Sequence, residues 1–299
     1  MSSKIYLSGC GGMLGSAFYE VFKDNYNLKC TDLNKNEEWI EKLDIRDSNL
    51  YKIDVEKFNP DYLFHLGAIT SLEDCENDTK NAYKTNTTAV ENATLISNEL
   101  NIPIIYISTA GIFDGKKNIY DDWDTPNPLG HYAKSKYLGE EFVKNNAKKY
   151  LICRAGWMMG GGPIKDKKFV NKIIKQINNG TKKLNIVNDK FGTPTYTLDF
   201  ANNLKLILEK RLWGLYNLVC EGLTSRKEVA EEILRFYGLE KKIDIQLVES
   251  SFFDKEYFAP RPDSERLINS KLNAINLNIM RDWKICLKEY LGRYDFLKI

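Results

Sequence analysis

The sequence predicts an α/β fold in which a doubly wound parallel sheet carries a smaller C-terminal region. Short runs rich in β-branched and aromatic residues alternate with longer helical patterns through the first half of the 299-residue chain. A glycine-rich turn follows the first of these runs, and the alternation stops after Arg154. Strands that alternate with helices are typical of a parallel sheet with helices on both faces.

Five runs have the length and composition of buried strands: residues 5–8, 28–31, 62–66, 104–108 and 150–154. The segments between them have apolar residues at helical spacing, which predicts helices over residues 13–22, 54–58, 82–100 and 132–145. We expect these helices to cover both faces of the sheet. This arrangement is the Rossmann-type fold.

The chain changes character at residues 160–163, where three glycines and a proline break regular structure. A helical run and a strand-like segment over residues 198–219 then predict a return to the large sheet. We therefore expect a dinucleotide-binding domain and a substrate-binding domain. The first comprises residues 1–156 with 193–219, and the second comprises residues 157–192 with 220–299.

Composition limits the possible functions. The chain has 43 Lys and Arg against 41 Asp and Glu, so the sequence predicts no broad positive field for nucleic acid or an anionic membrane. No stretch is apolar enough for a signal peptide or a membrane span, so we expect a cytoplasmic protein. Only two histidines are present and the six cysteines are scattered, so we expect reduced cysteines and no transition metal.

The first strand-like run leads into a Gly-x-x-Gly-x-x-Gly turn followed by a helix. Glycines let the backbone approach a pyrophosphate, and the amides at a helix N-terminus meet its negative charge. A plain tight turn is the alternative, but the position after the first strand favours a dinucleotide. We expect the cofactor to contact Gly9, Gly12, Met13, Leu14 and Gly15.

Asp32 ends the second predicted strand. A carboxylate here accepts hydrogen bonds from the adenosine ribose hydroxyls and repels a 2′-phosphate, which favours NAD(H). Lys29 and Lys35 are close enough in sequence to bind such a phosphate, so NADP(H) remains an alternative. A surface aspartate in a turn is the other interpretation.

Tyr132 and Lys136 are spaced so that they share one face of a predicted helix. A nearby ammonium can lower the pKa of a tyrosine from about 10, so that the phenol exchanges a proton with a carbonyl oxygen near neutral pH. We also expect Lys136 to hold the nicotinamide ribose. The alternative is an ordinary amphipathic helix with no chemical role.

Thr109 favours the chemical interpretation. It follows the predicted strand over residues 104–108, at the carboxyl edge where α/β sheets place their sites. Its hydroxyl can donate a hydrogen bond to the oxygen that becomes an alkoxide as hydride arrives. Thr109, Tyr132 and Lys136 together predict the catalytic residues of a reductase.

Four further segments carry a resemblance to a known family: residues 108–115, 154–157, 188–195 and 261–264. With the glycine turn, Asp44-Ile45, Thr109, Tyr132 and Lys136, they resemble motifs of the dTDP-4-dehydrorhamnose reductase family. That family belongs to the extended short-chain dehydrogenase/reductase superfamily. The resemblance extends over nearly the whole chain.

The resemblance implies reduction of the C4 ketone of a nucleotide-linked 4-keto-6-deoxy sugar by NADH or NADPH, in nucleotide-sugar or glycan biosynthesis. The nucleotide-diphosphate sugar is then the expected partner, and a homodimer is possible. The implied cofactor contacts are Asp44, Ile45, Leu66, Gly67, Ala68 and Asn86. On the substrate side, Trp157 is expected to pack on the sugar and Ala110 to line it. Arg261 is our candidate for the diphosphate, since a guanidinium binds phosphate oxygens bidentately, with a surface salt bridge as the alternative.

Ala110-Gly111 is the main departure from the family, which usually has Asp-Tyr at this point. The change removes a carboxylate and an aromatic ring, so recognition of the sugar hydroxyls must differ. It also argues against a 4,6-dehydratase, which uses an Asp-Glu pair here. The alternatives are an NDP-sugar epimerase of the same superfamily and a non-catalytic NAD(P)-binding regulatory subunit.

Overall fold

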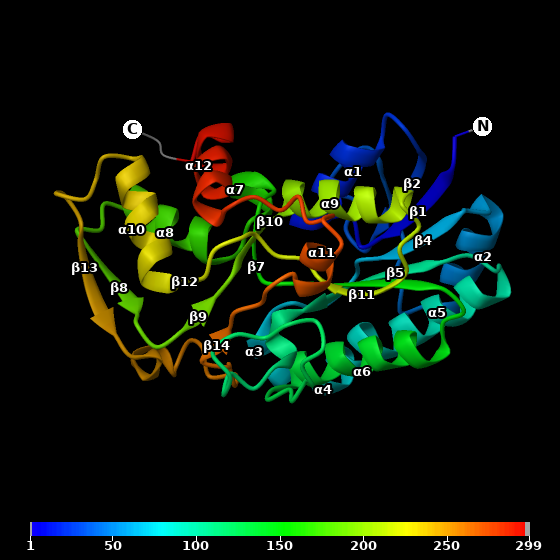
Figure 1. Ribbon diagram of the computed structural model, residues 1–299, viewed down its shortest axis with the longest axis horizontal. Helices are drawn as coiled ribbons and strands as arrows, with labels where there is room; N and C mark the ends of the chain where they lie inside the picture. The colour runs from blue at the N-terminus through cyan, green and yellow to red at the C-terminus, as the bar shows by residue number, and fades with distance from the viewer. Residues whose placement is uncertain (1, 297–299) are drawn as a thin grey trace.

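A seven-stranded parallel sheet forms the centre of the computed structural model, which describes residues 2–296 (Figure 1). The strand order is β11-β6-β5-β4-β1-β2-β3. The strands are β1 (Lys4–Ser8), β2 (Asn27–Asp32), β3 (Ile40–Lys42), β4 (Tyr62–His65), β5 (Ile104–Thr109), β6 (Tyr150–Ala155) and β11 (Gly214–Asn217). The strands that follow β1 are added first on one side of it, as β2 and β3, and then on the other side, starting with β4. The point between β1 and β4 is a topological switch point, where α/β proteins bind ligands. The predicted Rossmann-type fold is confirmed.

Helices cover both faces of this sheet. In Figure 1, α1 (Met13–Phe22) and α9 (Thr197–Glu209) lie above it, whereas α5 (Ala89–Glu99) and α6 (His131–Asn146) lie below. The helix α2 (Ser48–Phe58) packs against α5. Successive side chains of β1 point to opposite faces of the sheet, which explains the two helical layers. Ile5 and Leu7 belong to the core between the sheet and α1, and Tyr6 belongs to the core between the sheet and α5.

Two predicted helices differ from the observed ones. The helix α2 begins at Ser48, before the predicted residue 54, because the Asp47 carboxylate accepts a hydrogen bond from the Leu50 amide at 3.0 Å and caps it. The helix predicted over residues 82–100 is divided into α4 (Thr79–Tyr83), the π-helix η1 (Lys84–Thr88) and α5. A π-helical turn inside an α-helix often marks a functional site.

The remaining elements build the region on the left of Figure 1 and the segments that border the sheet. They are α3 (Leu72–Asn77), η2 (Ala110–Ile112), β7 (Trp157–Met159), α7 (Gly162–Lys165), α8 (Phe169–Asn178), β8 (Lys183–Val187), β9 (Phe191–Gly192), β10 (Pro194–Tyr196), β12 (Thr224–Ser225), α10 (Arg226–Phe236), β13 (Asp244–Val248), η3 (Ser250–Phe253), β14 (Ser264–Glu265), α11 (Ser270–Ala274) and α12 (Trp283–Arg293). Three small sheets are formed, with orders β12-β9-β14, β13-β8 and β10-β7. Since α9 packs on α1 and β11 pairs with β6, residues 197–217 contact the large sheet. The domain boundaries stay a prediction.

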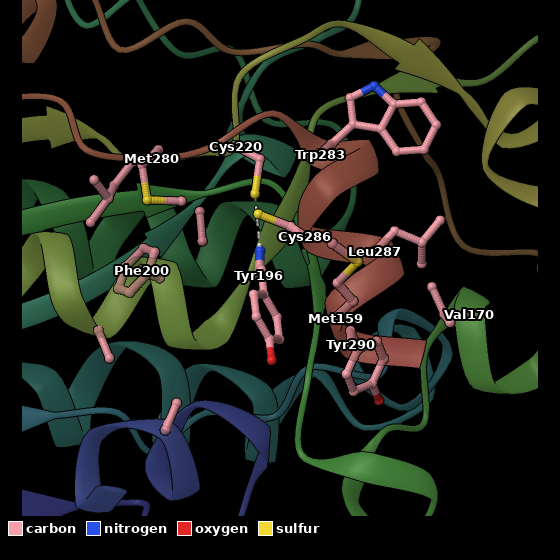
Figure 2. Close-up of a cluster of buried hydrophobic side chains, with 14 of the residues drawn as sticks. Met159, Val170, Tyr196, Phe200, Cys220, Met280, Trp283, Cys286, Leu287 and Tyr290 are labelled. Carbon is pink, nitrogen blue, oxygen red and sulfur yellow. Dashed lines mark hydrogen bonds between the residues drawn. The ribbon is translucent and has the colours of Figure 1, made fainter. Parts of the chain in front are cut away.

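One apolar core joins the C-terminal helix to the sheet side of the molecule (Figure 2). Trp283 and Tyr290 of α12 are buried in the same core as Phe200 of α9. Cys220 and Cys286 lie in the same core, and all six cysteines are free and buried. Within residues 2–296, no helix is both long and apolar enough to cross a bilayer.

Candidate active site

The glycine turn joins β1 to α1 at the carboxyl edge of the sheet. Gly9 has φ +80°, and a Cβ added to it would lie 2.2 Å from the amide nitrogen of Gly67. A Cβ on Gly15 would lie 2.2 Å from the carbonyl oxygen of Cys10, so both glycines are required by close packing within the protein. A Cβ on Gly12, by contrast, would meet nothing within 4 Å.

Gly12 is also the N-cap of α1 and provides no side chain to satisfy the helix amides. Met13 and Leu14 are the first residues of that helix. Open space in front of an uncapped helix N-terminus fits a pyrophosphate. The cofactor contacts of the turn stay a prediction.

Asp32 lies beside the glycine turn at the end of β2. Its carboxylate accepts hydrogen bonds from the amides of Gly11 at 2.8 Å and Asn34 at 2.9 Å, which fixes its orientation. Lys29, one of the two candidate phosphate partners, is instead paired with Asp54 at 2.8 Å. Lys35 is the other candidate and is exposed.

The residues expected beside the adenine and along the cofactor also gather at this edge. Leu66, Gly67 and Ala68 follow β4 directly. A Cβ on Gly67 would lie 2.5 Å from Cδ1 of Ile45, so Ile45 packs on that segment. The Asp44 carboxylate is held by Arg46 at 2.7 Å, and this hydrogen-bonded guanidinium lowers the pKa of Asp44.

Asn86 lies in the π-helix and joins the loop after β4 to α6. Its side chain accepts a hydrogen bond from the Ile69 amide at 2.8 Å and donates to the Ile69 carbonyl at 3.0 Å. The same amide group donates to the Ser135 hydroxyl at 3.1 Å. Asn86 therefore fixes the position of the loop relative to the helix that carries Tyr132.

Thr109, at the end of β5, and Tyr132, in the first turn of α6, meet around Gly111. A Cβ on Gly111 would lie 3.5 Å from Oγ1 of Thr109 and 3.8 Å from Cε1 of Tyr132. The Gly111 amide donates a hydrogen bond to the Thr109 hydroxyl at 3.1 Å. The structure thus brings together the threonine and tyrosine that the sequence placed in one site.

The pKa of Tyr132 differs from the expectation. The pKa of Tyr132 is raised to about 12, mainly by burial; the Thr109 hydroxyl opposes this shift, and the negative charge of Glu265 adds to it. The predicted lowering by a neighbouring ammonium is therefore wrong for the protein alone, since removal of the phenol from water disfavours the phenolate. Tyr132 keeps its proton at neutral pH.

Lys136 is buried one turn further along α6. Its Nζ donates a hydrogen bond to the Ile107 carbonyl at 2.7 Å and lies 4.2 Å from the centre of the Tyr106 ring. Burial lowers the pKa of Lys136 to about 7, and the charge of Glu140 opposes that shift.

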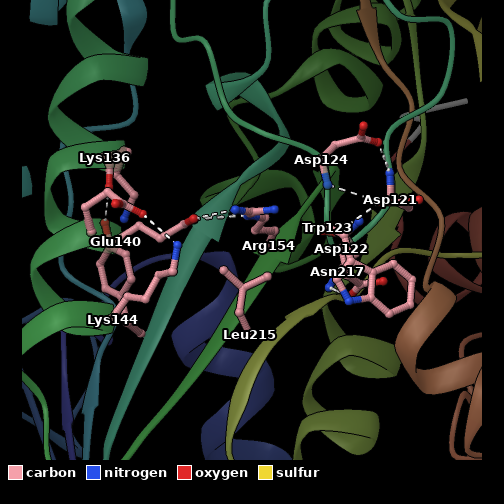
Figure 3. A network of polar contacts seen from close by, with 12 residues as sticks. Asp121, Asp122, Trp123, Asp124, Lys136, Glu140, Lys144, Arg154, Leu215 and Asn217 are labelled. Atoms are coloured by element: carbon pink, nitrogen blue, oxygen red, sulfur yellow. Dashed lines mark hydrogen bonds and ion pairs between the residues drawn. The ribbon is translucent and has the colours of Figure 1, made fainter.

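Glu140 connects α6 to the sheet through a buried ion pair with Arg154 of β6 (Figure 3). The Arg154 Nη2 atom lies 2.5 Å from Oε1 of Glu140, and both side chains are almost fully buried. Figure 3 shows Lys136 on the same helix as Glu140. The pair ties α6 to β6 one turn beyond Lys136.

Trp157 packs closely against Gly192 and Arg226. A Cβ on Gly192 would lie 2.2 Å from Cε2 of the indole, and the Arg226 guanidinium lies 3.5 Å from the ring centre. The indole Nε1 donates a hydrogen bond to Glu265 at 2.7 Å. A sugar would have to displace Arg226 to stack flat on this ring, so the contact of Trp157 with the sugar stays a prediction. Ala110 is buried in the 3-10 turn after Thr109.

The two arginines of this region have different partners. Arg261 forms an ion pair with Glu73 at 2.7 Å and donates to the Ala259 carbonyl at 2.9 Å, as in the salt-bridge alternative. The Arg226 guanidinium has no hydrogen bond or ion pair within the described residues. It is stacked on Trp157 and lies 4.7 Å from the ring centre of Phe169, and burial lowers its pKa to about 10.

Sequence reasoning missed Arg226 and Glu265 as members of the site. Glu265 directly follows the matched segment 261–264, so an extension of that motif by one residue would have included it. Arg226 opens α10 after a capping serine, and no local signal marks it. Within residues 2–296, no group of three or more His, Cys, Asp or Glu side chains is placed to hold a metal ion.

Comparison with known proteins places this geometry among sugar-nucleotide enzymes. The family model described as the RmlD substrate binding domain matches residues 3–296. The chain is 28% identical over 290 residues to the spore coat polysaccharide biosynthesis protein SpsK of Bacillus subtilis, and the match covers 97% of each chain. It is 26% identical over 298 residues to a dTDP-4-dehydrorhamnose reductase of Aggregatibacter actinomycetemcomitans, covering 96% of this chain and 97% of the relative.

A solved structure shows the same similarity in three dimensions. The dTDP-4-dehydrorhamnose reductase of Bacillus anthracis, crystallised in complex with NADP, superimposes with a TM-score of 0.88. The two sequences are 25% identical, and the match covers 98% of this chain and all (100%) of the other.

Proposed function

Because the chain belongs to the RmlD substrate binding domain family, we propose that it is an NAD(P)H-dependent reductase of a nucleotide-linked 4-keto-6-deoxy sugar. The reduced position is the C4 ketone, and the product carries a hydroxyl there. The observation that carries the proposal is the approach of Thr109 and Tyr132 around Gly111, with Lys136 one turn further along the same helix. A reductase of the same family with NADP bound and a relative named for polysaccharide biosynthesis support it.

The chain's own residues fit a dinucleotide at the switch point of the sheet. Gly12, with open space where a Cβ would lie, leaves the N-terminus of α1 free for the pyrophosphate. Asp32 lies beside this turn at the end of β2, where it can accept hydrogen bonds from the ribose. The nicotinamide cofactor supplies the hydride for the reduction.

Tyr132 is the proton donor of the proposed reaction. Its raised pKa keeps the phenol protonated at neutral pH, which is the state that reduction of a ketone requires. The Thr109 oxygen accepts a hydrogen bond from the Gly111 amide, and the Thr109 hydroxyl interacts with the Tyr132 phenol in the protein alone. In the proposed reaction this hydroxyl donates its proton to the substrate oxygen instead. Lys136 holds the ribose on the same helical face and stabilises Tyr132 once the phenol has given up its proton.

Arg226 is the better candidate for the diphosphate. Arg261 uses its guanidinium inside the chain, whereas Arg226 bonds no other residue among 2–296 and lies against Trp157. A guanidinium with no internal partner and partly removed from water gains most from a phosphate. Arg261 then positions the segment that leads to β14.

The proposed function is tested with a panel of NDP-4-keto-6-deoxy sugars, offered with NADPH and with NADH. We expect oxidation of one cofactor in equal amount to the 4-hydroxy sugar formed, identified by NMR. Isomerisation without net cofactor oxidation would instead establish an epimerase. No turnover of any sugar by a protein that binds the cofactor would contradict both enzymatic functions.

A further inference from the structure

Glu265 brings a carboxylate to the two hydroxyls of the site. It lies on β14, paired in register with Gly192 of β9, which fixes its backbone. Its Oε1 atom is 3.4 Å from the position that a Cβ on Gly111 would occupy. Thr109 and Tyr132 converge on that same position, so all three side chains border one small space.

One oxygen of this carboxylate is held and the other is not. Oε2 accepts the hydrogen bond from the Trp157 indole at 2.7 Å. Oε1 has no hydrogen bond or ion pair with the part of the chain that the structure describes. The nearby Arg226 stacks on the Trp157 ring, and Arg261 is paired with Glu73. The protein therefore orients Glu265 while leaving an acceptor free beside the catalytic hydroxyls.

We propose that Glu265 is a specificity-determining residue of the reductase, whose free oxygen accepts a hydrogen bond from the C3 hydroxyl of the keto sugar. The proposal rests on the proposed function. C3 bears the hydroxyl next to the reacting C4 carbonyl, and Glu265 borders the same space as the two residues that bind the carbonyl oxygen. Ala110 has only a methyl side chain and Gly111 has none, so neither residue offers a side-chain acceptor for such a bond.

The energetics favour discrimination by this contact. A carboxylate desolvated by a bound sugar loses its water partners, so a sugar without the hydroxyl leaves the charge unsatisfied. A hydrogen bond to a charged group changes binding by about 10- to 100-fold. This contact would therefore select sugars by their C3 substituent.

Glu265 also affects Tyr132 through its charge. The groups that shift the pKa of Tyr132 are the Thr109 hydroxyl of β5, Glu265 of β14 and Cys75 of α3, and the last two raise it. Neutralising Glu265 should therefore lower the pKa of Tyr132. The alkaline limb of the pH profile of kcat/KM would then move to lower pH, which a purely structural role would not cause.

The test compares Glu265→Gln with wild type on an NDP-4-keto-6-deoxyhexose and on its 3-deoxy analogue. Glu231→Gln is the matched control, since Glu231 lies on α10 and forms a surface ion pair with Lys227. We expect Glu265→Gln to reduce kcat/KM for the hydroxylated sugar about 10- to 100-fold, to change it less than about threefold for the analogue, and to shift the alkaline limb down. The control should match wild type on both sugars.

Equal losses on both sugars, or wild-type activity on the hydroxylated sugar, would overturn the role of Glu265 while leaving the reductase function intact. Failure of the wild type to reduce any keto sugar would contradict the proposed function itself, and the role of Glu265 with it. If Glu265→Gln has a lower melting temperature than wild type, Glu265→Asp is tested in its place, because aspartate keeps the charge but has a shorter side chain. That variant should lose the same discrimination without moving the alkaline limb as far.

Discussion

Tyr132 and Lys136 share one face of α6, yet burial moves their pKa values in opposite directions. The pKa of Tyr132 rises to about 12 and that of Lys136 falls to about 7, because each side chain favours its neutral form away from water. The raised pKa keeps the phenol protonated, as the proposed role of proton donor requires. Burial lowers the pKa of the lysine, and the negative charge of Glu140 opposes that shift.

Replacing Lys136 with methionine should stabilise the fold while removing activity. The folded protein binds the lysine proton more weakly than the unfolded chain does, so wild-type stability rises with pH between about 7 and the usual lysine pKa of about 10.5. Lys136→Met lacks this penalty, and its free energy of unfolding should exceed that of wild type by about 1 kcal/mol at neutral pH. Urea unfolding at several pH values measures the difference.

The advantage of Lys136→Met should be largest below pH 7 and should shrink toward pH 10.5. Lys136→Arg is the control, because it keeps a buried charge that does not titrate in this range. A variant less stable than wild type at pH 6 would show that the lysine contributes to folding more than its burial costs.

At the scale of elements, the turn between β1 and α1 combines two kinds of glycine. Gly9 and Gly15 lie against neighbouring backbone, so their lack of a side chain serves the fold. Gly12 faces open space, so its lack of a side chain is not needed for packing. This contrast separates folding from cofactor binding within one short segment.

Gly12→Ala should fold normally but bind the cofactor weakly, since a methyl group at this position meets no protein atom within 4 Å and projects into the proposed pyrophosphate site. We expect an increase in the dissociation constant of NADPH of at least about 10-fold, the equivalent of about 1.4 kcal/mol, by fluorescence titration. Gly9→Ala should instead lower the melting temperature, because its φ is +80° and its Cβ would overlap Gly67. Unchanged NADPH affinity in Gly12→Ala would argue against a pyrophosphate at this turn.

At the scale of the whole molecule, the site is assembled from two regions far apart in the sequence. The proposed catalytic residues lie on β5 and α6, whereas Trp157, Arg226 and Glu265 come from the segments that follow β6. The core around Trp283 and Tyr290 joins those later segments to α9 and hence to the sheet. Binding of the cofactor and binding of the sugar nucleotide are therefore expected to depend on different residues.

Arg226→Leu should affect the sugar nucleotide alone. We expect the KM of the sugar nucleotide to rise about 10- to 100-fold because a charge-assisted contact is lost, and the KM of NADPH to stay unchanged. Arg261→Leu should mainly lower thermal stability, because it leaves Glu73 without its partner. Steady-state kinetics and thermal melting compare the two variants. If Arg261→Leu alone raised the KM of the sugar nucleotide, the assignment of the diphosphate to Arg226 would be reversed.

Periodicity and turn chemistry predicted most of the large sheet. The helix α1 matches its predicted bounds, and the glycine turn and Thr109 lie at the predicted edge. The strand β3 was missed because its three residues include a single buried side chain. The predicted direction of the Tyr132 pKa shift was wrong. The shift depends on how deeply the side chain is buried in the packed structure, and the spacing of residues in the sequence does not reveal that burial. Arg226 and Glu265 reach the site only through tertiary packing.

The most direct test of the central claim is single-turnover oxidation of bound NADPH on mixing with the keto sugar that the panel identifies. If Tyr132 donates the proton, Tyr132→Phe should bind NADPH as wild type does but oxidise it at least about 100-fold more slowly, the usual contribution of general acid catalysis. Equal rates for wild type and Tyr132→Phe would contradict the account, since they would show that the proton comes from elsewhere.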